Sequence, residues 1–220
     1  MNRTILITNI FTLLILTFSN VRCYADDDIP AVAISEDIVF VDVMHNGKPV
    51  RIQRNQDAGN TINPAYALTS RKCPPFCIQP ARLAKGVETI GELEIIEYLQ
   101  QVSNGDNSVL VIDSRTPDWV KKGTIPGSVN IPWTELKPGA GADPFSIAEI
   151  LEQRFGAISL EGLWDFTNAK TLVLFCNGMW CGQSPTNIKT LLRFGYPPHK
   201  LKWYRGGMQD WESLGLTVTR

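Results

Sequence analysis

Histidine, excess positive charge and long apolar runs are scarce in this sequence, and each shortage excludes a class of function. Only two histidines, His45 and His199, occur in 220 residues, which nearly excludes a histidine-rich metal centre. The net charge is −1, whereas a general nucleic-acid binder would carry a basic excess. No apolar run reaches the roughly 18–20 residues that span a bilayer. The composition, with 44% hydrophobic and 20% charged residues, indicates an ordinary globular protein. We therefore expect no nucleic-acid partner, no metal and no other cofactor.

The first 25 residues have the three regions of a secretory signal peptide. Arg3 gives a positive start, a mostly apolar stretch covers residues 5–18, and Cys23 and Ala25 take the two small-residue positions before a cleavage site. The apolar stretch is too short for a membrane anchor. We expect cleavage near Ala25 and a periplasmic or secreted protein with no stable membrane anchor.

Four cysteines remain after this cleavage, and they form two close pairs. Cys73 and Cys77 have the spacing C-x3-C, and Cys176 and Cys181 have the spacing C-x4-C. In an oxidising compartment either pair can be a disulfide. The spacing matches no common zinc framework. For Cys73 and Cys77 three interpretations stay open: a structural disulfide, a redox pair that exchanges with Cys176 and Cys181, or a ligand pair for a metal that a partner helps to bind.

The chain after residue 25 divides at about residue 85. Residues 26–85 contain strand patterns at 38–44 and 49–53, joined by an Asn46-Gly47 turn typical of hairpins, and then a polar, irregular stretch. Residues 86–220 alternate between strand and helix patterns. The strands are expected at 109–112, 128–132, 171–175 and 202–204, and the helices at 90–101, 147–155, 184–194 and 210–214. This alternation predicts an α/β domain with a central, mostly parallel sheet flanked by helices. We expect residues 86–220 to fold without the segment before them.

The most informative segment is TLVLFCNGMWCGQSPTNIKTLL, at residues 171–192. A buried strand ends at Phe175, Cys176 follows at once, and a loop leads to a helix with Ser184 as expected N-cap and Pro185 as first residue. Ligands of open α/β sheets bind beyond the carboxyl ends of the strands, where loop N–H groups and a helix N-terminus favour an anion. A thiol placed there should have a depressed pKa. The alternative is that Cys176 and Cys181 form a disulfide that only staples the loop.

Four blocks in register make residues 86–220 resemble a rhodanese-like domain. They are VLVIDSR (109–115), GTIPGSVNIPW (123–133), LVLFC (172–176) and YRGGMQDWESLGLTV (204–218). The resemblance implies a small α/β fold and chemistry through a cysteine persulfide. It also implies that Cys176 is the nucleophile, and that Asp113 and Arg115 support the site unless they form only a structural ion pair. By the same resemblance, the loop after the nucleophile holds the substrate; its residues are Asn177, Gly178, Met179, Trp180, Gly182, Gln183 and Ser184.

The departures from this family pattern bear on the substrate. Thr124 stands where the family usually has histidine, and the loop is about two residues longer than usual. No Lys or Arg lies between Asn177 and Ser184, which argues against phosphatase activity and weakens the case for thiosulfate as donor. Met179 and Trp180 make the loop apolar, so they either contact a protein partner or an organic persulfide or pack on the sheet edge. Cys181 could attack a persulfide on Cys176, release sulfide and leave a disulfide.

Three functions therefore compete. The leading hypothesis is an exported sulfurtransferase that moves sulfane sulfur through a persulfide on Cys176, taken from a small donor or exchanged with a protein thiol or persulfide. The second is a periplasmic thiol–disulfide oxidoreductase that uses Cys176 and Cys181. The third is a non-catalytic binding module that presents Met179 and Trp180 to a protein partner.

Overall fold

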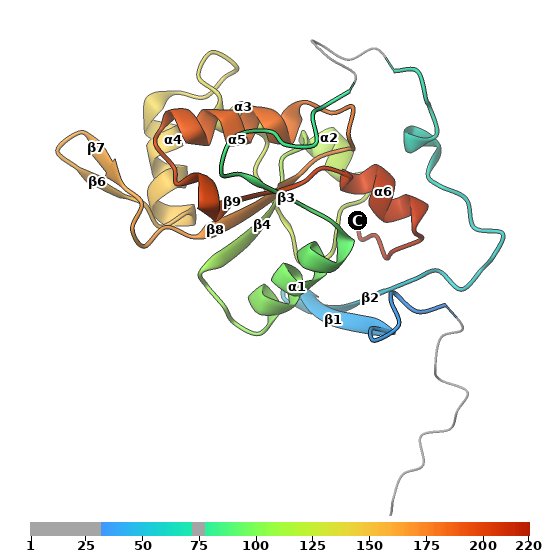
Figure 1. The fold of residues 1–220 in the computed structure, drawn as a ribbon. Helices are drawn as coiled ribbons and strands as arrows, with labels where there is room; N and C mark the ends of the chain where they lie inside the picture. The colour runs from blue at the N-terminus through green and yellow to red at the C-terminus, as the bar shows by residue number, and fades with distance from the viewer. Residues whose placement is uncertain (1–31, 72–77) are drawn as a thin grey trace, which may run out of the picture.

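A computed structural model describes residues 32–71 and 78–220 (Figure 1). The signal peptide expected at residues 1–25 and the pair Cys73 and Cys77 lie outside the described residues, and the expectations for them stay predictions. Among the described residues, no helix has the length and apolar character needed to cross a bilayer.

The centre of the fold is a five-stranded sheet in which every neighbouring pair of strands is parallel. The strand order is β3-β9-β8-β4-β5, with β3 at Glu88–Ile90, β9 at Leu201–Tyr204, β8 at Thr171–Phe175, β4 at Val109–Asp113 and β5 at Val129–Asn130. The helices are α1 at Glu92–Ser103, α2 at Pro117–Val120, α3 at Trp133–Leu136, α4 at Pro144–Glu149, α5 at Gln183–Arg193 and α6 at Gly207–Ser213. A π-helical turn at Ile150–Arg154 continues α4. The predicted α/β fold with a mostly parallel central sheet is confirmed.

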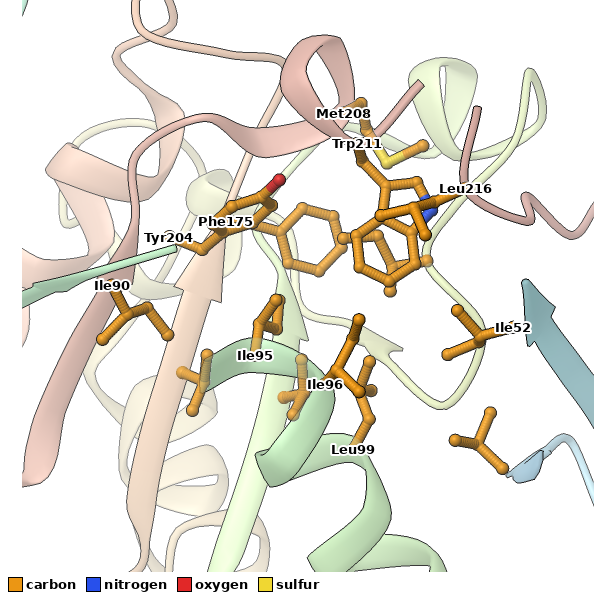
Figure 2. Packing of buried hydrophobic residues seen from close by; sticks show 14 of the residues in the cluster. Ile52, Ile90, Ile95, Ile96, Leu99, Phe175, Tyr204, Met208, Trp211 and Leu216 are labelled. Atoms are coloured by element: carbon orange, nitrogen blue, oxygen red, sulfur yellow. The ribbon is translucent and has the colours of Figure 1, made fainter. Parts of the chain in front are cut away.

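Each face of the sheet has its own hydrophobic core, because helices cover both faces. Along β8, Val173 and Phe175 belong to the core shared with α1 and α6, whereas Leu172 and Leu174 belong to the core shared with α5. Side chains of a strand alternate between the two faces, so a strand covered on both sides is apolar throughout. This is why residues 172–175 form a continuous apolar run. Figure 2 shows the first core, where α1 side chains meet those of β8, β9 and α6.

The hairpin before residue 85 packs on the domain. Strands β1 (Phe40–His45) and β2 (Lys48–Gln53) pair antiparallel, and Asn46 and Gly47 both have positive φ, as the predicted turn requires. Val41, Val43 and Ile52 are buried in the same cluster as the side chains of α1, and Ile52 lies beside α1 in Figure 2. The boundary at residue 85 stays a prediction, but the hydrophobic core crosses it.

Several local expectations need correction. Ile90 ends strand β3 and does not begin a helix, since α1 begins at Glu92 after Gly91. The strand expected over 128–132 is paired only at Val129–Asn130. An antiparallel pair formed by β6 (Ile158–Leu160) and β7 (Leu163–Asp165) has no counterpart in the expectations, because its alternation is too short to stand out.

Candidate active site

Cys176 is the first residue after β8, and the chain on both sides of it is held by hydrogen bonds. Its carbonyl oxygen accepts from the backbone N–H of Met208 at 3.0 Å, and that of Asn177 accepts from Gln209 at 3.0 Å. Both donors lie in α6, so this helix is fixed against the loop. Gly207 permits the close approach: its φ is +56°, and a Cβ there would lie 2.3 Å from the carbonyl oxygen of Cys176.

Ser184 donates a hydrogen bond to the sulfur of Cys176 and is not the N-cap of α5. The helix begins at Gln183 with Gly182 as cap, which places Ser184 in the first turn, fully buried. Its Oγ lies 3.1 Å from Cys176 Sγ and accepts from the indole Nε1 of Trp203 at 3.3 Å. Because Trp203 can only donate, the hydroxyl hydrogen of Ser184 is directed at the sulfur. The expected N-cap is therefore wrong, and the same serine contacts the thiol directly.

The environment of Cys176 favours its thiolate. Burial raises the pKa of this thiol, but hydrogen bonds from the thiol of Cys181, the hydroxyl and N–H of Ser184 and the N–H of Gly178 outweigh it and lower the pKa to about 7. Burial and the neighbouring Cys176 together hold the pKa of Cys181 well above its ordinary value. The depressed pKa predicted from the strand-end position is thus found at Cys176, and the second thiol serves it as a hydrogen-bond donor.

Cys181 is buried beside Cys176, and both are free thiols in the structure. Its backbone N–H donates to the carbonyl oxygen of Gly178 at 2.9 Å, which closes the loop. The sulfur accepts from Asn177 Nδ2 at 3.9 Å. Its single hydrogen has two acceptors within reach, Cys176 Sγ and Gln183 Oε1, the latter 3.8 Å from the sulfur. The loop therefore brings both thiols and the amides of Asn177 and Gln183 into one buried cluster.

Asp113 and Arg115 form a buried ion pair that contacts the loop on its side facing the protein interior. Arg115 is completely buried, and its Nε and Nη2 donate to the carboxylate of Asp113, with the shortest distance 2.6 Å. The remaining N–H groups donate to the carbonyl of Gly123, the hydroxyl of Tyr66 and the amide oxygen of Asn177. Thr124 donates to Asp113 at 2.7 Å. Since every donor of Arg115 is engaged, the pair holds the chain in place and does not face a substrate.

Aromatic rings and cations gather beside the outer part of the loop. Trp180 is half-buried and donates from Nε1 to Gln209 at 2.8 Å, and Trp119 lies 6.3 Å away, ring to ring. The guanidinium of Arg71 lies 4.4 Å from the centre of the Trp180 ring, and the ammonium of Lys122 lies 4.3 Å from that of Trp119. Met179 is 37% exposed. The loop itself lacks cations, but Arg71 lies over its tryptophan, Trp180, and Lys122 lies over the neighbouring Trp119.

Most of the residues singled out from the sequence meet at this site, and several others were missed. Asn177, Gly178, Gln183 and Ser184 surround the thiols of Cys176 and Cys181. Met179 is exposed, whereas Trp180 packs against the core shared with α1 and α6. The missed residues are Tyr66, Trp203, Gln209 and Gly207. Only Gly207 gave a signal, as part of the Gly-Gly pair in the fourth block. Tyr66 lies in a stretch without any pattern. In the described part of the chain, no three His, Cys, Asp or Glu side chains lie close enough together to bind a metal ion.

Residues 96–214 match the sequence model of the rhodanese-like domain. Similar solved structures include a Rhodopseudomonas palustris protein described as a possible tyrosine phosphatase, with 22% identity over 62% of this chain and 88% of that one, at a TM-score of 0.40. A thiosulfate sulfurtransferase of Pseudomonas aeruginosa shares 18% identity over 62% of this chain and 21% of its own, at a TM-score of 0.41. A human single-domain sulfurtransferase shares 20% identity over 58% of this chain and 96% of its own, at 0.37. Structural similarity at this level does not define an activity. No curated protein matches the chain.

Proposed function

Because the chain belongs to the rhodanese-like domain family, we propose that it is an exported sulfurtransferase that carries sulfane sulfur as a persulfide on Cys176. The observation that carries this proposal is the thiol of Cys176, buried at the end of β8, with its pKa lowered to about 7 by directed hydrogen bonds. A thiol with this pKa is about half thiolate at neutral pH. The thiolate is the form that attacks sulfur.

The transfer is two displacements at sulfur. In the first, the Cys176 thiolate attacks the outer sulfur of a donor persulfide; the new S–S bond forms as the donor's S–S bond breaks, and the donor leaves as a thiolate. In the second, an acceptor thiolate attacks the outer sulfur now held on Cys176, and the Cys176 thiolate is the leaving group. The low pKa of Cys176 favours this second step, because a weaker base leaves faster.

The surroundings of the loop favour a persulfide donor over thiosulfate. Residues 177–184 contain no Lys or Arg, and the guanidinium of Arg115 is fully engaged beneath the loop. A dianionic donor within the loop would therefore receive no charge-assisted bond from residues 177–184 or from Arg115, and such bonds usually hold such groups. A small organic persulfide, or a persulfide on a partner protein, presents less charge and suits the apolar side chains of Met179 and Trp180.

A second candidate function follows from the contact between the two thiols. Once Cys176 carries sulfur, Cys181 can attack the inner sulfur, so that a Cys176–Cys181 disulfide forms and hydrogen sulfide leaves with the transferred sulfur. The hydrogen bond between the two thiols supports this reaction. The protein would then release sulfide and would need an external reductant, such as a dithiol, to restore both thiols.

Intact mass after incubation with a small organic persulfide tests the two functions. The sulfurtransferase should gain one sulfur atom, lost again when a small thiol is added. Cys176→Ser should gain none. Cys181→Ser should load sulfur and keep it longer, whereas the wild type should lose two hydrogens if Cys181 resolves the persulfide. If neither the wild type nor the two variants show a change in mass, both functions are contradicted and the non-catalytic binding module is the remaining hypothesis.

Export is tested separately. The proposal rests on the signal-peptide pattern of residues 1–25. Sequencing of the N-terminus after expression in a Gram-negative host should find a protein that begins near Asp26 in the periplasmic fraction. A chain that retains Met1 in the cytoplasm would contradict export and leave the chemistry of Cys176 unaffected.

A further inference from the structure

Tyr66 reaches the candidate active site from outside the segment that matches the family. It ends a short 3-10 helix at Pro64–Tyr66, thirty residues before the matched region begins at residue 96. The side chain is 1% exposed. Its hydroxyl accepts from Arg115 Nη1 at 2.7 Å and donates to Asn177 Oδ1 at 3.4 Å. Two contacts anchor it: Gln209 Nε2 donates to its carbonyl at 3.1 Å, and its ring stacks on Trp119 with centroids 5.8 Å apart.

These contacts leave the side-chain amide of Asn177 only one orientation. Arg115 can donate but not accept, so the atom of Asn177 that lies 3.3 Å from its Nη1 must be the oxygen. The hydroxyl of Tyr66 already accepts from Arg115, so its own hydrogen is free for the same oxygen. The amide nitrogen must then point the other way, where Cys181 Sγ lies 3.9 Å from it.

An N–H directed at the sulfur of Cys181 affects the hydrogen on that sulfur. The S–H has to turn away from the amide hydrogens, toward Cys176 Sγ or Gln183 Oε1. A sulfur that accepts a hydrogen bond is also polarised into a better donor. We propose that Tyr66 and Asn177 are positioning residues that hold the Cys181 thiol in the orientation from which it donates to Cys176. This inference deepens the proposed function, and it rests on that function only for the role of Cys176 as nucleophile.

Among the described residues, charged and titratable groups reach the thiol pair and its supports from the loop, from the end of β4, from the N-terminal segment and from α6. Cys181 belongs to the loop, Asp113 ends β4, and Arg115 follows it. Tyr66 comes from the N-terminal segment, and Glu212 of α6 interacts with both Tyr66 and Arg115. The positive charge of Arg115 interacts with the thiolate of Cys176, and its pairing with Asp113 keeps that charge fixed. Burial raises the pKa of Tyr66 to about 12, so its hydroxyl stays protonated while Cys176 titrates. A change at Tyr66 therefore acts on Cys176 through hydrogen bonds and not through a new charge.

The test is the pH dependence of Cys176 alkylation by iodoacetamide, followed by peptide mapping, in the full chain. Tyr66→Phe keeps the ring and removes only the hydroxyl. We expect the midpoint of alkylation to rise by roughly half a pH unit to one unit, the effect of losing one neutral hydrogen bond. Asn177→Ala should raise it by at least as much. The double variant should match Asn177→Ala alone, because Tyr66 acts through Asn177.

Tyr196→Phe is the matched control. Tyr196 is equally buried, and its hydroxyl donates to the carbonyl of Lys170 at 2.6 Å in the other core, so its loss should leave the midpoint unchanged. The proposal is overturned if Tyr66→Phe lowers the melting temperature but not the alkylation midpoint, which would make Tyr66 only structural. It is also overturned if the effects of Tyr66→Phe and Asn177→Ala add. If Asn177→Ala does not fold, the midpoint of Tyr66→Phe alone decides. Alkylation needs no sulfur transfer, so these outcomes are independent of the sulfur-loading test.

Discussion

Replacing Ser184 by alanine should make Cys176 a weaker acid and a slower nucleophile. The substitution removes the hydroxyl that lies 3.1 Å from Cys176 Sγ and leaves the backbone N–H of residue 184 in place. A hydrogen bond to a charged group contributes about 1.5–3 kcal/mol, which corresponds to roughly one to two pKa units. The pKa of Cys176, which is about 7 in the native protein, should therefore rise to roughly 8–9. The thiolate fraction at neutral pH should fall from about half to about a tenth or less.

The assay is the rate of Cys176 alkylation as a function of pH, with the modified peptide identified by mass. Thr186→Val is the matched control, because the hydroxyl of Thr186 lies in the same first turn of α5 but donates to the carbonyl of Gly182 at 2.7 Å. Removing this hydroxyl tests whether weakening the start of helix α5 is enough by itself to change the pKa of Cys176. Circular dichroism and melting temperature should show that both variants remain folded.

Two results would refute this reasoning. If Ser184→Ala leaves the midpoint unchanged, the backbone N–H groups and Cys181 suffice to hold the thiolate. If Thr186→Val raises the midpoint as much as Ser184→Ala, the effect comes from the helix N-terminus and not from the hydroxyl.

Three further predictions concern stability. Gly207→Ala should destabilise the protein by more than about 2 kcal/mol and slow Cys176 alkylation, because the new Cβ would lie 2.3 Å from the Cys176 carbonyl oxygen. The control is Gly139→Ala, where φ is also positive but the space around the new Cβ is open. It should lower the free energy of unfolding in urea by only about 1 kcal/mol. Ile52→Ala should cost about 2–5 kcal/mol, because Ile52 is fully buried in the core with α1, and a loss below 1 kcal/mol would show that the hairpin is a separate unit. The pKa of Cys176 in the folded protein is lower than the ordinary thiol pKa of 9.0. Ionisation of Cys176 therefore stabilises the folded state. This stabilisation is complete above pH 9 and is lost as the pH falls below about 7. The stability of the wild type relative to Cys176→Ser, measured by urea unfolding, should therefore increase from pH 7 to pH 9, and a flat difference would contradict the lowered pKa.

The sequence alone determined those features that depend on local pattern. The run at 171–175 predicted a buried strand, because side chains alternate along a strand and the four residues after Thr171 are all apolar. Asn46-Gly47 predicted the turn, because few residue pairs adopt positive φ twice in succession. The position of Cys176 directly after β8 predicted that loop N–H groups would surround the thiol. These inferences need only the neighbours along the chain.

The tertiary structure decided which partners contact the thiol. Ser184 followed by Pro185 has the pattern of an N-cap, but the helix begins one residue earlier, and Trp203 turns the serine hydroxyl toward Cys176. The sequence left open whether Asp113 and Arg115 support the site or form only a structural ion pair, and the tertiary structure shows which groups engage every N–H of the guanidinium. Tyr66 lies 111 residues from Asn177 in the sequence, in a stretch with no periodicity. A hydrogen bond depends on distance and direction between atoms, and packing of the whole chain sets both, so no pattern of neighbouring residues could reveal these contacts.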